Sequence, residues 1–174
     1  MTAVILPEQR PAGRRGFEIA LPTAVTGGTA AIVEARIPGS MAGPPLHIHL
    51  VSEETYFVVS GTLVMHVGGK VTQLTAGGVA YISRGTQHTW ATAPGGEVHF
   101  LTLHTPGGYE EYHPAALQLE EDLGRQPTQE DLLQLSQRYD WELIGPEARR
   151  LLPNGTLIEA SRADAEAAKS AGSA

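Results

Sequence analysis

The stretch of sequence that decides the fold runs from Gly43 to Gly61 and reads GPPLHIHLVSEETYFVVSG. Two of the seven histidines, His47 and His49, stand one residue apart on a segment that otherwise suits a buried strand. Side chains at positions i and i+2 of a strand lie on one face, so both imidazoles project together. Buried imidazoles need polar partners, and a divalent metal ion is a partner for both. The pair therefore predicts half of a metal site.

Two further residues are predicted to complete this site. Glu54 begins the next strand, and His88 follows a turn at residues 83–85. Three imidazoles and one carboxylate suit one divalent transition metal, either Fe, Mn, Co, Ni, Cu or Zn, and are too rich in nitrogen for Mg or Ca. Glu53 points to the opposite face by strand alternation, so we expect it to be solvated or ion-paired.

Short apolar runs separated by turn residues predict the rest of the core. Paired glycines such as residues 68–69 and 77–78 mark the turns. Short strands at this spacing are typical of an all-β sandwich or barrel. The predicted strands cover residues 16–22, 29–38, 46–49, 54–61, 62–69, 70–74, 78–83, 88–93 and 97–104.

The character of the sequence changes after Pro106. Residues 114–124 begin with proline and end with glycine, which predicts a helix. Residues 128–140 predict a second helix, with Thr128 as its N-cap. We expect both helices to cover the barrel. The predicted organisation is an N-terminal arm (1–16), a β-barrel (17–113), a C-terminal helical extension (114–160) and a tail (161–174).

Composition limits the function classes. The 174 residues, 41% of them hydrophobic, are enough for one folded domain. A net charge of -7, with lysine only at Lys70 and Lys169, argues against nucleic-acid binding. The lack of cysteine excludes disulfides, thiolate metal sites and cysteine nucleophiles. No apolar run approaches the roughly 20 residues of a membrane helix, and we recognise no signal peptide, so we expect a cytoplasmic protein without membrane contact.

The glycine-framed segments resemble the two motifs of the cupin superfamily of small-barrel metalloproteins. The first motif is matched by His47 and His49, by Glu54 after four residues, and by Gly61 after six more. The glycine expected before it is Gly43 or Gly39. The second motif is matched by Gly77, Gly85 and His88, whereas Ser83 and Thr92 stand where the family has proline and asparagine. The resemblance covers roughly residues 31–106.

The resemblance implies a fold and a ligand set. The fold is an all-β, double-stranded β-helix (jelly-roll) cupin barrel, here with short C-terminal helices. The implied metal ligands are His47, His49, Glu54 and His88. The segments GGYEEYHPA and RYDWELIGP are also similar to the C-terminal parts of cupins described as quercetin 2,3-dioxygenase-like. In that group a flavonol-like enol binds the metal and the metal-bound glutamate serves as the base, a catalytic role that falls to Glu54.

Other polar and aromatic residues were assigned by alternation. Tyr56 and Trp90 each stand two residues past a ligand, and together with His99 they are predicted to bind substrate. His66 is predicted to face solvent. His104 and His113, near the end of the barrel, are also predicted to be surface groups.

We therefore expect a metal-dependent dioxygenase that acts on an enol-like or aromatic small molecule with O2. One alternative is a cupin cyclase or isomerase of a biosynthetic pathway, and another is a non-catalytic small-molecule-binding cupin. No DNA-binding segment accompanies the barrel, which favours an enzyme over a sensor. A homodimer is expected from the resemblance, because the N-terminal arm can pair with an exposed sheet edge of a second copy.

Overall fold

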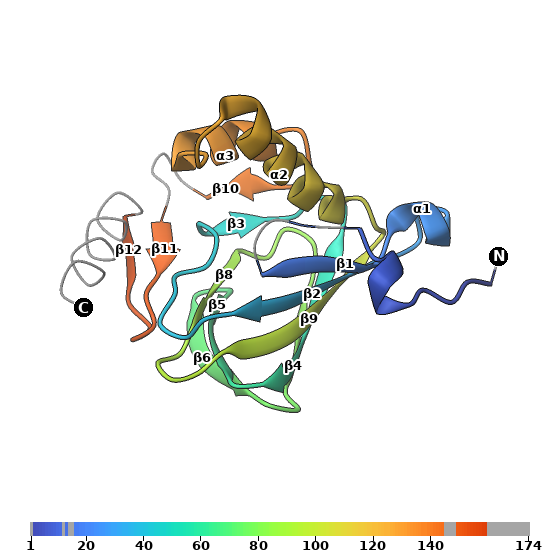
Figure 1. Cartoon of the computed structure of the whole chain (residues 1–174). Coiled ribbons are helices and arrows are strands. Elements are labelled where there is room, and N and C mark those ends of the chain that lie inside the picture. Colours follow the sequence, from blue (N-terminus) through green and yellow to red (C-terminus); the bar gives the residue numbers. More distant parts are fainter. Residues whose placement is uncertain (1, 12, 14–15, 145–148, 160–174) are drawn as a thin grey trace.

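Two antiparallel five-stranded sheets form the body of the molecule, which a computed structural model describes for residues 2–11, 13, 16–144 and 149–159 (Figure 1). The first sheet has the order β1-β2-β9-β4-β7 and the second the order β10-β3-β8-β5-β6. This arrangement confirms the predicted all-β jelly roll. The predicted tail at residues 161–174 lies outside the described residues.

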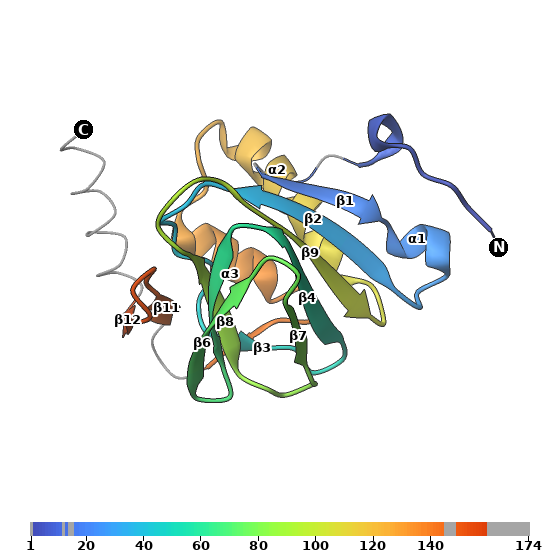
Figure 2. The same cartoon turned by 90° about the horizontal axis from the view of Figure 1, so that it is seen from below.

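The strands agree closely with the runs predicted from the sequence. The first sheet contains β1 (Phe17–Leu21), β2 (Ala31–Ile37), β9 (Val98–Thr105), β4 (Glu53–Ser60) and β7 (Val79–Ile82). The second contains β10 (Glu142–Leu143), β3 (His47–Ile48), β8 (His88–Thr92), β5 (Thr62–Val67) and β6 (Lys70–Thr75). Figure 2 shows the two sheets from below, and the main core cluster takes its residues from strands of both.

Alternation along the strands determines which side chains fill this core. In β2 and β9 every second residue is buried, and the paired residues Ala35 and Phe100 both belong to the main core cluster. Buried residues of β4 and β8, including Tyr56 and Trp90, join the same cluster. Such alternation is what a sheet with one face on a core requires.

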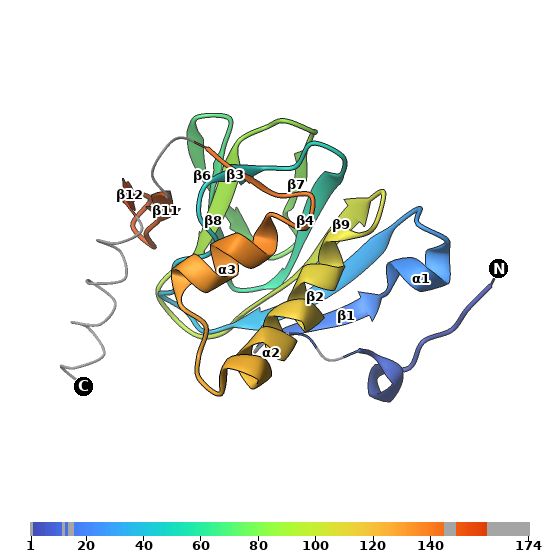
Figure 3. The same ribbon diagram turned by 90° about the horizontal axis from the view of Figure 1, so that it is seen from above.

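Helices cover one end of the barrel. The helix α2 (Tyr112–Leu123) and the helix α3 (Gln129–Ser136) lie above the sheets in Figure 1, and the view from above shows α2 crossing over β1 and β2 (Figure 3). Thr128 accepts a hydrogen bond from the Asp131 amide and completes a capping box, so α3 begins where the sequence predicts but ends four residues earlier. Short helical turns are η1 (Pro7–Gln9), α1 (Thr23–Thr26) and η2 (Tyr109–Glu111). Among the described residues, no helix is both long and apolar enough to cross a membrane.

The C-terminal extension also contains strands that the sequence did not predict. The strand β10 pairs with β3, and a hairpin of β11 (Arg149–Leu151) and β12 (Leu157–Glu159) packs on β5 and β8. Leu151 clusters with Val64 of β5, on the outer face of the second sheet. The prediction that His66 is a surface residue is therefore wrong, because the hairpin covers this face and leaves His66 only 8% exposed.

Candidate metal centre

Three strands, drawn from both sheets, bring the candidate ligands together. His47 in β3 and His88 in β8 are directly paired across the second sheet. Glu54 projects from β4 of the first sheet, and His49 follows β3. All four side chains are buried, and one ligand atom from each lies within 4.8 Å of the others. The structure thus brings together the four residues that the sequence nominated.

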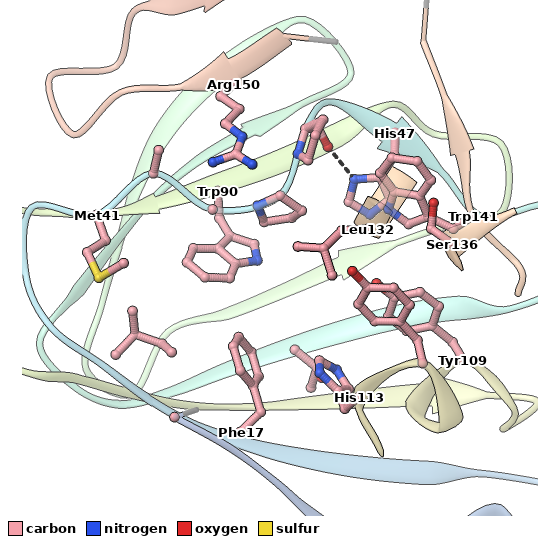
Figure 4. A pocket seen from close by; sticks show the side chains of 18 of the residues that line it. Phe17, Met41, His47, Trp90, Tyr109, His113, Leu132, Ser136, Trp141 and Arg150 are labelled. Atoms are coloured by element: carbon pink, nitrogen blue, oxygen red, sulfur yellow. Dashed lines mark hydrogen bonds between the residues drawn. The ribbon is translucent and has the colours of Figure 1, made fainter. Parts of the chain in front are cut away.

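Each imidazole is oriented by a hydrogen bond to a backbone carbonyl. His47 Nδ1 donates to Pro45 O at 2.7 Å (Figure 4), and His88 Nδ1 donates to Thr86 O at 2.9 Å. His49 Nδ1 donates to the carbonyl oxygen of Asp140. Because a carbonyl can only accept, the proton lies on Nδ1 and the lone pair of Nε2 faces the centre, as metal ligation requires.

Glu54 is the acidic member of the cluster. Its Oε2 lies 2.9 Å from His88 Nε2 and 3.6 Å from His49 Nε2. Its Oε1 lies 3.3 Å from Nε2 of His104. Burial raises the pKa of Glu54, but His104 and the contacts with His49 and His88 outweigh burial and hold the pKa well below its usual value. Glu54 is therefore a carboxylate at neutral pH.

The donor set fits a divalent transition metal. It offers three imidazole nitrogens and a carboxylate oxygen, a combination that suits these ions. His49 Nε2 is buried and has no hydrogen-bond partner among the described residues, which is the situation a metal ion relieves. These four residues would hold the ion, which would supply Lewis-acid chemistry to a molecule bound beside it.

The metal-free protein is expected to be most stable near pH 6.5–7. Burial lowers the pKa of His47, as do the neighbouring His88 and His49, and burial also lowers the pKa of His104. As the pH falls below 6.5, the unfolded chain therefore binds protons that the folded chain does not yet bind. Stability should then fall by up to about 1.4 kcal/mol per pH unit for each group as the pH drops. Burial alone would lower the pKa of His49, but Glu54 and Asp140 outweigh burial, and the pKa of His49 is raised. The stability that protonated His49 contributes to the folded state is therefore lost as the pH rises above 6.5.

Urea unfolding in the presence of a chelator at pH 5.5, 6.5 and 7.5 measures this dependence. A free energy of unfolding that is constant or rises between pH 6.5 and 5.5 would contradict the expectation. His104→Gln should flatten the acid limb, since glutamine does not titrate there.

A cavity of about 500 Å³ adjoins the cluster, between the barrel and the helices (Figure 4). Its wall is mainly apolar and aromatic. The barrel contributes Phe17, Trp90 and Phe100, and the extension contributes Tyr109 and Leu132. The cavity reaches His47, Glu54 and His104, so a bound molecule can touch the cluster. Pockets of this size and character bind small organic molecules.

The three predicted substrate-binding residues have different positions. Tyr56 and Trp90 both line the cavity, and Tyr56 also contacts Glu54. His99 is not among the residues that line it and lies on the outer face of β9, with Nε2 2.8 Å from Glu34 Oε1. The inner face of β9 is the one that carries Phe100 and His104. His99 therefore contacts Glu34 outside the cavity instead of lining it.

Two cavity residues were missed by the sequence analysis. His104 and His113 were predicted at the surface, yet they are 1% and 7% exposed and both line the cavity. His113 stacks on Phe17, with ring centroids 4.7 Å apart. His104 shares a strand face with Phe100 and Thr102, but the opposite face is also apolar, so alternation did not identify it. The burial of His113 depends on the helical extension folding back over the barrel.

Comparisons with known proteins agree with this architecture. Residues 33–104 match the family model described as a cupin domain. KdgF from Halomonas sp. has 16% identity and a TM-score of 0.51, covering 61% of this chain and 96% of its own. A predicted oxalate decarboxylase from Thermotoga maritima has 22% identity and a TM-score of 0.51, covering 60% of this chain and all (100%) of its own.

A third similar structure is a protein with a double-stranded beta-helix domain from Klebsiella pneumoniae subsp. pneumoniae. It has 22% identity and a TM-score of 0.50, and the match covers 62% of this chain and 92% of the other. A search of curated proteins found no significant match to the sequence. At these identities the structural likeness concerns the fold alone.

Proposed function

We propose that this chain, which contains a cupin domain at residues 33–104, is a metal-dependent dioxygenase of the quercetin 2,3-dioxygenase-like type. Its substrate is an enol-like or aromatic small molecule. The observation that carries the proposal is the convergence of three imidazoles and Glu54 on the wall of a largely apolar cavity of about 500 Å³. The cavity is large enough for a ring system, and its aromatic wall suits one.

The protein's own groups have separable roles in such a reaction. A bound divalent ion supplies Lewis-acid activation of a substrate hydroxyl and a site for oxygen chemistry. Glu54 accepts the hydroxyl proton at a carboxylate oxygen, since its low pKa keeps it ionised. Tyr56 and Trp90 contact the substrate ring from the barrel side. The apolar wall and the covering helices exclude water from the reacting atoms.

Elemental analysis followed by an activity screen tests the proposal. The purified protein should contain about one transition metal ion per chain. With that metal restored in full, a flavonol or a similar enol should be consumed together with O2. A metal-loaded protein that consumes no O2 with any enol-like or aromatic substrate would refute the dioxygenase assignment.

A cyclase or isomerase is the second candidate, and one observation favours it. Nε2 of His104 lies 3.3 Å from Glu54 Oε1, and Tyr56 adjoins the same carboxylate, so the cavity holds several groups that can relay protons. Substrate turnover without O2 would support this candidate. A non-catalytic binder would instead release its ligand unchanged after tight binding.

We also propose that the chain forms a homodimer. The strand β7 lies at the edge of the first sheet, and its outer face exposes Val79 and Tyr81, each 59%. Phe57, beside Val79 on β4, is 42% exposed. An exposed apolar edge of this kind favours association with a second copy. Light scattering of the wild-type protein should give a mass of two chains. Tyr81→Glu places a charge on this edge and should reduce the measured mass toward that of one chain. A monomeric wild-type mass would refute the dimer.

A further inference from the structure

Residues 140–143, which follow α3 and include β10, are in direct contact with the strand that carries His47. The first of these residues accepts the hydrogen bond from His49 Nδ1. Trp141 stacks on His47, with ring centroids 5.2 Å apart and planes 24° apart. Residues 142–143 form β10, in which Leu143 pairs with His47. Two of the three candidate imidazoles are therefore held by a segment about 90 residues away in the sequence.

This arrangement distinguishes His49 from the other imidazoles. His47 and His88 each donate to the carbonyl two residues earlier, so their own strand ends supply their orientation. The orientation of His49 instead depends on the C-terminal extension reaching the barrel. An imidazole whose outer nitrogen loses its partner can change tautomer or rotate, and either change weakens metal ligation.

The Asp140 side chain fixes the position of this carbonyl. Its Oδ1 accepts hydrogen bonds from the amides of Leu50 and Val51 at 2.7 and 2.9 Å. Its Oδ2 accepts from the amide and the hydroxyl of Ser52 at 2.6 and 2.7 Å. Burial raises the pKa of Asp140, but these four hydrogen bonds outweigh it and lower the pKa. One carboxylate thus connects the segment after α3 to the loop between His49 and Glu54.

We propose that Asp140 is a positioning residue of the metal centre, and that metal binding and docking of residues 140–143 on the barrel stabilise each other. The inference rests on the metal binding proposed above but not on the reaction. Because the carboxylate holds the loop whose two ends carry His49 and Glu54, its loss frees two ligands at once. Coupling of this kind is reciprocal, so a metal ion must also make the opening of the segment less favourable.

Asp140→Asn tests the positioning role. Asparagine keeps the size of the side chain but replaces one acceptor oxygen with an NH2 group, which cannot accept from Ser52. Competition with a chelating indicator should show a dissociation constant for Co(II) about 10–100-fold higher than in the wild type. At saturating cobalt, the visible spectrum should also change, since the ligand field reports the ring of His49. Asp122→Asn, an exposed carboxylate of α2 without contact to the barrel cluster, should leave both readouts unchanged.

Two further measurements cover the case in which Asp140→Asn does not fold. Ser52→Ala removes one of the four donors and should raise the dissociation constant by a smaller factor. In the wild type, saturating cobalt should slow amide hydrogen exchange at residues 50–52 and 141–143. Unchanged exchange, or equal cobalt affinity and spectra in folded Asp140→Asn and wild type, would overturn the positioning role alone. A wild-type chain that binds no divalent metal would overturn the metal centre itself.

Discussion

Replacing His88 with alanine is expected to lower the affinity for divalent metal by more than about 100-fold, since loss of a ligand should exceed the 10–100-fold cost of losing an outer hydrogen bond. His88 is fully buried (0% exposed) and lies closest of the three imidazoles to the carboxylate, with Nε2 2.9 Å from Glu54 Oε2. Elemental analysis after dialysis against free metal measures the result.

The matched control for this variant is His66→Ala. His66 is also a buried strand histidine, 8% exposed, but it belongs to the outer face of the second sheet and not to the four-residue cluster. Both variants lose a buried ring, so both should unfold at lower temperature than the wild type. Only His88→Ala should lose its metal. Wild-type metal content and affinity in folded His88→Ala would contradict the assignment of His88 as a ligand.

His47, His49 and Glu54 could be located from the sequence because they are neighbours along the chain, whereas His88 was identified by the glycine-framed turn before it and by the resemblance to the second family motif. His47 and His49 share a face through the period of a strand, and the spacing to Glu54 selects it over Glu53. The structure supports that selection, since Glu54 is buried while Glu53 lies 3.7 Å from Arg84 at the surface. Features of this kind depend on a few neighbouring residues, so a single sequence contains them.

The sequence could not decide which face of β9 is the inner one. His99, Leu101 and Leu103 form one face, and Phe100, Thr102 and His104 form the other. Both faces carry apolar residues, because the sheet bearing β9 also has a partly apolar outer surface. Alternation alone therefore allowed His99 in the cavity and left His104 outside, the reverse of the observed arrangement.

The contribution of the C-terminal extension was also beyond sequence reasoning. The segment 128–140 was predicted as one continuous helix, whereas α3 ends at Ser136 and the chain turns so that Asp140 reaches the barrel. The short strands β10, β11 and β12 have two or three residues each, too few for a periodic pattern. The pairing partner of β10 is β3, which lies far away in sequence, so only the folded chain identifies it.

Replacing Glu54 with glutamine is expected to lower turnover per bound metal by about 10²–10⁴-fold, the usual contribution of a general base. Glutamine matches the volume of glutamate and keeps one oxygen that can face the ion, so part of the metal affinity should remain. It cannot accept the substrate proton. O2 uptake and substrate loss, both divided by the measured metal content, separate failure of proton transfer from loss of the ion.

Glu53→Gln is the matched control, because it makes the same chemical change on the next residue, whose side chain pairs with Arg84 instead of entering the centre. Its turnover should stay close to the wild-type value. If Glu54→Gln retains metal and still turns over substrate at nearly the wild-type rate, the proton acceptor is another group. His104 would then be the first alternative, since its Nε2 already lies 3.3 Å from the same carboxylate and reaches the same cavity. The double variant Glu54→Gln, His104→Gln should in that case abolish the activity that the single variant keeps.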